Sequence, residues 1–598
     1  MAPSHAAVEP ARARRSPRRL AGWVALVVLL LLLLATTWVG VRGFLAKGEL
    51  ESAVVLAASI QGQIVDGEAD AARQAFGQLD GHASSAASLT SDPVWRGFEL
   101  LPFVGPNLTA VRELAAVVSD ISRDAVGPLI GVAGIIDVDD FKPADGAIDV
   151  QPLLDAQPEV AAVDAALIAA SDRVGAINTS ATLAPLRDAV EELESLVAEA
   201  SGGVDVLDRA IRLLPPMLGA SGPRDYVLLF VNPAELRATG GIAGALALLR
   251  TENGRIELAQ QASTADFPFY EEPVLKLPVE TRNLYGDITG QYVQDVNLTP
   301  YFPLSGALAR EMWRQEFGVE AHGVLSIDPV ALGYLLEATG PITLLTGDVL
   351  TAENAVQTLL VDAYARYADP ADQDAFFAAA AASVFSAVAG GNFDPVALVS
   401  ALAQAGDERR VHIWSADEAE QTILAGTTLT GDLPTSTVAT TRFGAYFNDA
   451  TGAKMNVYLD VQQSVGRATC REDGRPVYRV QVALANTAPG DAAATLSEYV
   501  TGGGINGVKP GNINTIVSVY GAPDMENLGV TRNGADVGYQ PARDSGYPVS
   551  LVAVELAPGE SAVLGFNWLG ATASDSSIVI ESTPTVHTVE TGKLAISC

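Results

Sequence analysis

The sequence predicts a multidomain α+β protein in which an N-terminal transmembrane helix is followed by a helical bundle, a mixed α/β domain and an antiparallel β-sandwich. Three observations predict this class. An uncharged apolar run lies near the N-terminus, helical periodicity follows it, and the last part of the chain alternates with a period of two. A chain of 598 residues is also too long for one domain. The predicted parts are a cytoplasmic basic arm (1–19), the transmembrane helix (20–41), the helical bundle (42–218), the α/β domain (219–445) and the β-sandwich (446–598).

The charge composition excludes one class of partner. Lys and Arg total 37 against 71 Asp and Glu, which gives a net charge of -34. The phosphates of a nucleic acid would repel so acidic a chain, and the sequence has no basic stripe to offset the repulsion. We therefore expect no nucleic-acid partner.

The transmembrane helix is predicted from Leu20 to Val41. This uncharged run has 22 residues, which span about 33 Å at about 1.5 Å each and so cross a hydrocarbon core of about 30 Å. Trp23 and Trp38 lie near its two ends, where aromatic belts form. A cleaved signal peptide is the alternative, but its apolar region would have about 7–15 residues and end in small-x-small. The lipid bilayer is therefore the predicted partner of residues 20–41.

A cluster of arginines predicts the orientation of this helix. By the positive-inside rule, the cluster keeps the N-terminus in the cytoplasm and leaves the bulk of the chain extracytoplasmic at the cell membrane. The cluster consists of Arg12, Arg14, Arg15, Arg18 and Arg19.

Apolar residues recur every three or four positions from about residue 48 to residue 214, which predicts the bundle. The clearest stripe alternates spacings of three and four. It consists of Leu183, Leu186, Val190, Leu193 and Val197.

The period changes at about Arg224. Short apolar runs at Tyr226–Val231 and Ala243–Leu249 predict buried strands, and Asn253-Gly254 predicts a hairpin turn after the second run. Helical patterns follow, so this region mixes strands with helices. These patterns cover residues 305–317, 329–338, 352–367 and 371–388.

From about Lys454 onward the chain reads as short alternating strands, which predicts the β-sandwich. The chain contains two cysteines, Cys470 and Cys598, in a compartment expected to be oxidising. We expect a disulfide between them that ties down the C-terminal strand. Two unrelated buried thiols are the alternative.

The connection from Asn232 to Gly241 is the most unusual polar stretch, since it lies between two apolar strands. Arg237 offers a forked set of donors, Thr239 a hydroxyl group, and Gly240 and Gly241 exposed backbone N–H groups. Ligand clefts tend to form at the ends of the strands in α/β domains. The connection therefore predicts an anion-binding pocket.

We expect Arg366 to reach this pocket from a helix that ends near Tyr367. The alternative is a tight structural connection in which a neighbouring carboxylate neutralises Arg237. The candidates for that carboxylate are Glu235, Asp266 and Asp295. No metal site is predicted, because the five histidines are scattered and no cysteine pair has zinc-ligand spacing.

Several segments resemble the bacterial family called domain of unknown function 4012. They are Leu101-Pro102-Phe103-Val104-Gly105 with Ala110-Val111-Arg112, then Glu235-Leu236-Arg237-Ala238-Thr239-Gly240-Gly241, and Gly323–Pro329 leading to Thr339-Gly340-Pro341-Ile342. The resemblance covers the chain from the anchor to about residue 445. It implies a membrane-anchored envelope protein with no settled activity.

A weaker resemblance is to the LytR-CpsA-Psr phosphotransferases, which move glycopolymers from polyprenyl-pyrophosphate carriers onto the cell wall. It implies that Arg237 is an early pocket arginine and that Arg366 and Asp369 belong to a later basic segment. This segment lacks the several arginines and the Arg-Gln pair of that family, and a Pro-Arg-Asp element is missing. Loss of these cations removes the clamp for a pyrophosphate.

Three functions therefore stay open. The chain is a non-catalytic envelope module that contacts cell-wall glycopolymer or another envelope protein, a glycopolymer phosphotransferase, or a binder of a lipid-linked glycan that has lost the chemistry. No cofactor is expected, except Mg²⁺ if the chain is a phosphotransferase.

Overall fold

The computed structural model describes residues 17–65, 68–136, 141–144, 146–571 and 576–596. It has a mixed α/β architecture with an N-terminal apolar helix and several sheets, which confirms the predicted class at this level. The chain divides into two compact units. The first unit comprises residues 1–137 and 152–211, and the second comprises residues 138–151 and 212–598.

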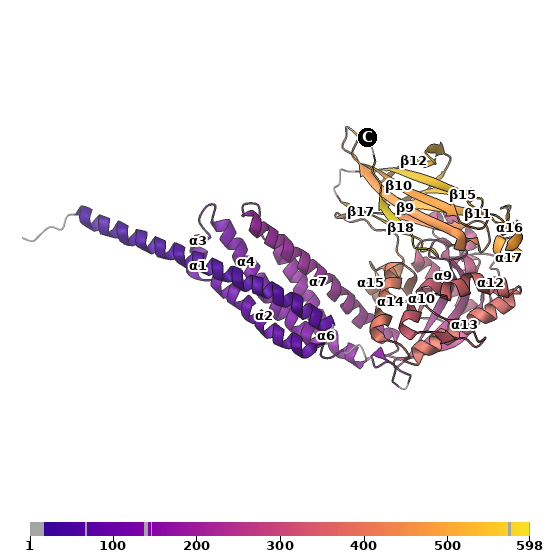
Figure 1. Ribbon diagram of the computed structural model, residues 1–598, viewed down its shortest axis with the longest axis horizontal. Helices are drawn as coiled ribbons and strands as arrows, with labels where there is room; N and C mark the ends of the chain where they lie inside the picture. The colour runs from indigo at the N-terminus through magenta and orange to yellow at the C-terminus, as the bar shows by residue number, and fades with distance from the viewer. Residues whose placement is uncertain (1–16, 66–67, 137–140, 145, 572–575, 597–598) are drawn as a thin grey trace, which may run out of the picture. The chain divides into compact units, whose positions relative to one another are not determined.

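The first unit is helical. Helix α1 (Pro17–Val65) includes the predicted transmembrane segment and continues past it, and one segment of it, Ala21–Ile60, is long and apolar enough to cross a membrane. α1 packs against α2, and α2 packs against α4 (Figure 1). The other helices are α2 (Ala69–Thr90), α3 (Pro93–Phe98), α4 (Gly105–Ile121), a π-helical turn (Ser122–Val126), α5 (Gly127–Val132), α6 (Gln151–Gly175) and α7 (Ala184–Met217).

The predicted helical stripe is part of the core of this unit. Val190 and Val197 of α7 are buried against Leu114 of α4 and Val174 of α6. The predicted end of the bundle, residue 218, lies one residue past the end of α7.

The second unit contains a five-stranded sheet of order β3-β2-β1-β4-β7. β1 and β4 are parallel and the other pairs are antiparallel. The strands are β1 (Arg224–Asn232), β2 (Ile242–Glu252), β3 (Arg255–Ser263), β4 (Gly323–Ile327) and β7 (Val411–Ser415).

The predicted hairpin turn joins β2 to β3. Asn253 and Gly254 both have positive φ, 48° and 77°, as a two-residue hairpin turn of type I′ requires. A Cβ atom at Gly254 would lie 1.8 Å from the carbonyl oxygen of Ile148, so the position accepts only glycine.

Helices cover both faces of this sheet. Val227, Leu229 and Val231 of β1 point to one face, where they pack with α9 (Phe302–Phe317). Leu228 and Phe230 point to the other face, because side chains alternate along a strand. The remaining α-helices and strands of this part are α8 (Val279–Tyr285), α10 (Pro329–Thr339), β5 (Ile342–Thr343), β6 (Val349–Leu350), α11 (Ala355–Gln357), α12 (Ala363–Arg366), α13 (Pro370–Ala389), α14 (Pro395–Asp407) and α15 (Glu418–Leu424). A π-helical turn (Thr358–Asp362) and 3-10 helices (Thr264–Asp266, Asp287–Gly290, Val293–Leu298 and Thr428–Thr430) complete it.

Two further sheets follow, of order β13-β12-β16-β10-β9-β18 and β14-β15-β11-β8-β17 (Figure 1). Buried side chains from both sheets share one hydrophobic core, for example Val480 and Phe566 from the first and Phe443 from the second. The bounds are β8 (Thr440–Asp449), β9 (Leu459–Ala468), β10 (Val477–Asn486), α16 (Ala492–Thr495), α17 (Glu498–Thr501), β11 (Ile513–Tyr520), β12 (Glu526–Arg532), β13 (Ala535–Val537), β14 (Gln540–Asp544), β15 (Tyr547–Leu556), β16 (Ser561–Leu569), β17 (Ser577–Ser582) and β18 (Glu590–Lys593).

Three details of this region differ from the sequence prediction. The sheets are not wholly antiparallel, since β17 pairs in parallel with β8 and β18 with β9. The predicted boundary between residues 445 and 446 falls inside β8. Met455–Tyr458 form a 3-10 helix rather than the start of a strand, because their backbone turns to meet the β1–β2 connection, where Asn456 hydrogen-bonds Ala234 and Leu236.

The register at the edge strand bears on the predicted disulfide. β18 pairs with β9 at a constant offset of 128 residues, as between Val465 and Lys593. The same offset separates Cys470 from Cys598. Cys598 lies outside the described residues, so the bond stays a prediction.

We expect peptide mapping of the unreduced protein by mass spectrometry to recover the two cysteine peptides as one linked species; an alkylatable thiol at Cys470 would contradict the bond.

Candidate functional site: a buried charge network beside an apolar cavity

The connection from Asn232 to Gly241 is buried along its whole length, and side chains from β8 and from the 3-10 helix Met455–Tyr458 hold it. Asn456 Oδ1 accepts a hydrogen bond from the backbone N–H of Leu236, and Asn448 Oδ1 accepts one from Ala238, both at 2.9 Å. A Cβ atom at Gly241 would lie 2.4 Å from the carbonyl group of Asn232. The connection therefore needs its second glycine for close packing rather than for exposing N–H groups.

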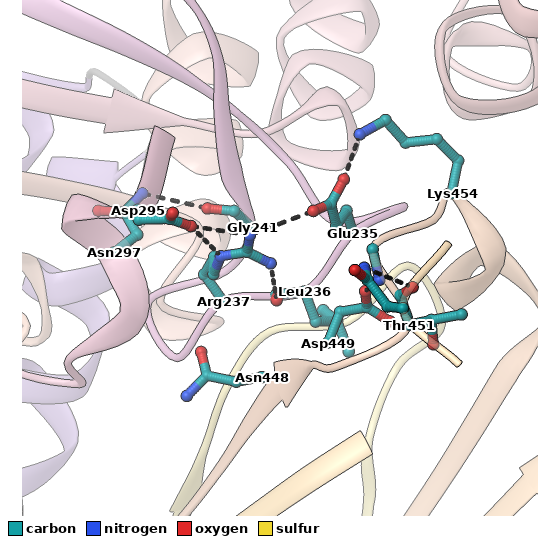
Figure 2. A network of polar contacts seen from close by, with 12 residues as sticks. Glu235, Leu236, Arg237, Gly241, Asp295, Asn297, Asn448, Asp449, Thr451 and Lys454 are labelled. Carbon is teal, nitrogen blue, oxygen red and sulfur yellow. Dashed lines mark hydrogen bonds and ion pairs between the residues drawn. The ribbon is translucent and has the colours of Figure 1, made fainter. Parts of the chain in front are cut away.

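Arg237 lies inside the protein with all its nitrogens engaged (Figure 2). Its Nε and Nη2 atoms donate to Asp295 Oδ1 at 3.1 and 2.9 Å, and Nη2 also donates to Glu235 Oε1 at 3.1 Å. Nη1 donates to the carbonyl oxygen of Leu236 at 3.1 Å. Only 7% of the residue is exposed, which walls the guanidinium group off from solvent. Two of the three carboxylates considered from the sequence, Glu235 and Asp295, thus neutralise it.

Two more ionisable side chains complete what we call the buried charge network, Glu235, Arg237, Asp295, Asp449 and Lys454. Lys454 Nζ pairs with Glu235 Oε2 (Figure 2). Asp449 Oδ2 accepts a hydrogen bond from the backbone N–H of Gly452 at 2.6 Å. The network holds two cations and three carboxyl groups, so one carboxyl group must be protonated for the charges to balance.

The pKa values indicate which carboxyl group keeps its proton. Burial, together with the negative charge of Glu235, raises the pKa of Asp449 to about 6. Burial alone would raise the pKa of Glu235 as well, but Lys454 and Arg237 outweigh it and hold that pKa below its ordinary value. Asp295 also has a raised pKa, because burial outweighs Arg237, yet it accepts two hydrogen bonds from Arg237 that favour its charged form. With a pKa of about 6, Asp449 is protonated below that pH and ionises above it.

The other residues predicted for an anion pocket lie elsewhere or serve the backbone. The Thr239 hydroxyl group is buried and has no hydrogen-bond partner among the residues that the structure describes, and Gly240 adopts a positive φ of 117°. Arg366 Nη1 pairs with Asp348 at 2.8 Å in a partly exposed position. Asp369 caps α13 by accepting a hydrogen bond from Ala371 N at 3.0 Å.

The expected pocket shared by Arg237 and Arg366 is therefore wrong. The physical reason is that each arginine finds a carboxylate nearer to it in the fold, Asp295 and Asp348, respectively. Among the described residues, no group of three or more His, Cys, Asp or Glu side chains is placed to hold a metal ion.

The structure does contain a large cavity next to the connection, with a volume of about 690 Å³. One wall is the face of the five-stranded sheet that carries Leu228 and Phe230, and the opposite wall is α13. None of the six residues predicted to bind a ligand lines it. The apolar lining includes Ala243, Ala245, Leu258, Ile327, Leu332, Leu335, Leu359, Leu360, Phe377, Ala381, Val384, Phe385 and Val388. We call it the sheet cavity.

One part of the sheet cavity is polar and touches the buried charge network. Glu235 and Lys454 line it, together with Asn232, Tyr364 and Tyr499. Asn232 Nδ2 donates a hydrogen bond to the Tyr364 hydroxyl group, and Lys454 Nζ lies 5.8 Å from the centre of the Tyr499 ring. The other polar lining residues are Ser263, Thr264, Gln294, Asp328, Gln373, Asp374, Glu498 and Asn506. The cavity thus has mainly apolar walls with polar side chains at its margins.

This cavity was not predicted from the sequence, although one signal was present. α13 carries a broad apolar surface. Phe376, Ala380 and Val384 belong to a core with α10, and Ala380 and Val384 also line the cavity together with Phe377 and Phe385. An apolar surface this wide indicates that the helix borders more than one apolar region.

Comparison with known families is informative for one segment. Residues 221–364 match the family described as Protein of unknown function (DUF4012). The match confirms the predicted family on the segment that carries Glu235, Arg237 and Asp295. The search of the curated proteins found no match to the chain.

Proposed function

We propose that this protein, whose residues 221–364 match the DUF4012 family, is a membrane-anchored envelope protein that binds one long apolar chain in the sheet cavity. The family description assigns no activity. The observation that carries the proposal is the cavity itself, with aliphatic and aromatic walls and a volume of about 690 Å³. This volume is in the range of about 300–1,000 Å³ that small-molecule sites occupy.

The walls favour a hydrocarbon ligand. Protein interiors are close-packed, and cavities lined by Leu, Ile and Phe do not hold water well. Each CH₂ group of a ligand that leaves water for such a space gains about 0.8 kcal/mol. A chain of ten or more carbons would therefore bind without any strong polar contact.

A membrane is the natural source of such a chain. The apolar segment of α1 supports anchoring in a bilayer, and the arginines before it support an extracytoplasmic position for the remainder. Isoprenoid and acyl lipids both carry long apolar chains. The binding of cell-wall glycopolymer or of another envelope protein, as expected from the sequence, would then involve other surfaces of the chain.

The geometry favours binding over phosphoryl transfer. A pyrophosphate needs uncompensated cations, and the charges of Arg237, Lys454 and Arg366 are already balanced by carboxylates. The phosphotransferase alternative, with its Mg²⁺, would rely on Arg237 and Arg366, and both arginines are already paired with carboxylates.

Filling the sheet cavity should abolish binding. We expect Ala381→Trp to lower photocrosslinking of a diazirine-bearing alkyl probe to α13 at least tenfold, because the indole ring would occupy the space beside Phe377 and Phe385. The full-length protein in lipid nanodiscs would be irradiated with either a 16-carbon fatty acid or a polyprenyl phosphate probe, and the labelled peptides identified by mass spectrometry. The probe that labels α13 identifies the lipid class.

The matched control is Ala375→Trp, which adds the same side chain at an exposed position of α13 that does not line the sheet cavity. It should label like wild type. Equal labelling of α13 in wild type and Ala381→Trp would refute the proposed function.

A further inference from the structure

The loop after α3 exposes a cluster of large apolar side chains. Leu100 and Phe103 are 86% and 89% exposed, and Leu101 and Val104 are also exposed. Single exposed apolar residues are common on protein surfaces, but a contiguous group marks an interaction site. We call residues 100–104 the apolar loop.

The apolar loop has a defined conformation. Phe103 has a positive φ of 67°, which is strained for a bulky residue. Hydrogen bonds hold the loop, from Gly105 N to the Leu101 carbonyl oxygen at 2.8 Å and from Asn107 Nδ2 to that of Phe103 at 3.0 Å. A Cβ atom at Gly105 would lie 2.0 Å from the carbonyl oxygen of Glu99. The tight closure holds the apolar side chains outward instead of letting them fold onto the bundle.

The loop lies at the level where the apolar run of α1 ends. Arg42, the first charged residue after that run, pairs with Asp92 at 3.1 Å and donates to the carbonyl oxygen of Leu89 at 2.7 Å. The neighbouring Gly43 faces the ring of Trp95 in α3, and a Cβ atom there would lie 3.6 Å from it. Figure 1 shows α3 and the loop after it at the end of the bundle from which α1 projects.

A second exposed apolar side chain belongs to the same end. Leu183, before α7, is 69% exposed, and its backbone N–H donates to Asn107 Oδ1 at 2.8 Å. The carboxylates beside the apolar loop are neutralised, since Asp92 pairs with Arg42 and Glu99 pairs with Arg112 at 2.7 Å. Although the chain has a net charge of -34, this end of the bundle exposes apolar side chains, and the carboxylates beside them are paired with arginines.

We propose that the apolar loop, with Leu183 beside it, inserts into the outer interface of the lipid bilayer that α1 crosses. The occupant is a membrane because the loop continues the apolar surface of α1 at its exit, where Trp38 is exposed as an aromatic-belt residue would be. The insertion gives the helical bundle a second membrane contact beyond the anchor, which fixes its orientation relative to the bilayer. This proposal rests on the membrane anchoring proposed above.

Depth-dependent quenching tests this contact in the full-length protein in phosphatidylcholine nanodiscs. A fluorescent NBD label would be placed by Phe103→Cys in a background of Cys470→Ser and Cys598→Ser, and spin-labelled lipids would quench it. We expect quenching at position 103 to approach that of the anchor reporter, Leu30→Cys. The control is Val55→Cys, an exposed position of α1 that lies about 20 Å beyond Arg42 along the helix and should be quenched little.

The outcomes separate the loop from the anchor. Quenching at positions 30 and 103 but not at 55 supports the insertion. Quenching at position 30 alone overturns the insertion and leaves the anchor standing, and a partner protein would then be the occupant of the loop. Absence of quenching at position 30 overturns both. Circular dichroism of each labelled variant would check that the bundle remains helical.

Discussion

The substitution Arg237→Met should lower the free energy of unfolding of the second unit by about 3–5 kcal/mol, the usual cost of removing one partner from a buried ion pair. The variant would leave Asp295 without its cation and Glu235 with Lys454 alone. Neither carboxylate can turn to water, because their side chains are 16% and 10% exposed. Native-state hydrogen exchange of the β1 amides, followed by mass spectrometry, would measure the loss locally.

Arg366→Met is the matched control. Arg366 was predicted for the same pocket, but it pairs with Asp348 and its side chain is 46% exposed. Exposed ion pairs contribute about 0–1 kcal/mol, so we expect little change. If the two variants lost the same stability, or if Arg237→Met kept its stability and lost only ligand binding, Arg237 would be a ligand-binding residue and the structural role would be wrong.

The sequence could predict the features that depend on short-range order. The apolar run of α1, the Val190 and Val197 stripe and the Asn253-Gly254 hairpin turn each follow from the spacing or chemistry of neighbouring residues. The family segment was also recognisable, because its glycines and polar residues are consecutive. Even the two carboxylates that neutralise Arg237 were among the three considered from the sequence.

The environment of Arg237 could not be predicted, because it depends on residues far along the chain. Lys454 follows Glu235 by 219 residues, and nothing in either local sequence indicates their pairing. The same holds for Asn448 and Asn456, which bury the connection. An arginine beside two glycines has the same sequence whether it faces a ligand or a carboxylate, so only the tertiary structure distinguishes the two.

The sheet cavity was harder still to predict. A cavity is set by the distance between two elements that do not close on each other, here the sheet and α13. Sequence patterns report which faces are apolar, but they do not report whether two apolar faces touch. The wide apolar surface of α13 was the local sign of it.

Asp449→Asn should stabilise the protein, and the stabilisation should grow as the pH rises. In the folded protein the pKa of Asp449 is about 6, against an ordinary value of 3.8. Between these two values the unfolded chain has lost a proton that the folded chain keeps. The free energy of unfolding therefore decreases as the pH rises from 3.8 to about 6. Above about pH 6, the titration of Asp449 has lowered it by about 3 kcal/mol relative to its value below pH 3.8.

Asparagine removes this loss of stability at high pH because its side chain cannot ionise. Its side-chain oxygen can still accept the hydrogen bond from Gly452 N, and its amide group takes the place of the protonated oxygen, which has no hydrogen-bond partner within the described part of the chain. The difference in unfolding free energy between Asp449→Asn and wild type should thus increase by up to about 3 kcal/mol from pH 4 to pH 7. Measuring both proteins by hydrogen exchange of the β8 amides at each pH cancels the titration of the other groups. The prediction would be wrong if the difference in unfolding free energy did not change with pH, or if the variant became less stable than wild type as the pH rises. Arg237 and Lys454 would then keep Asp449 ionised, and another carboxyl group of the network would hold the proton.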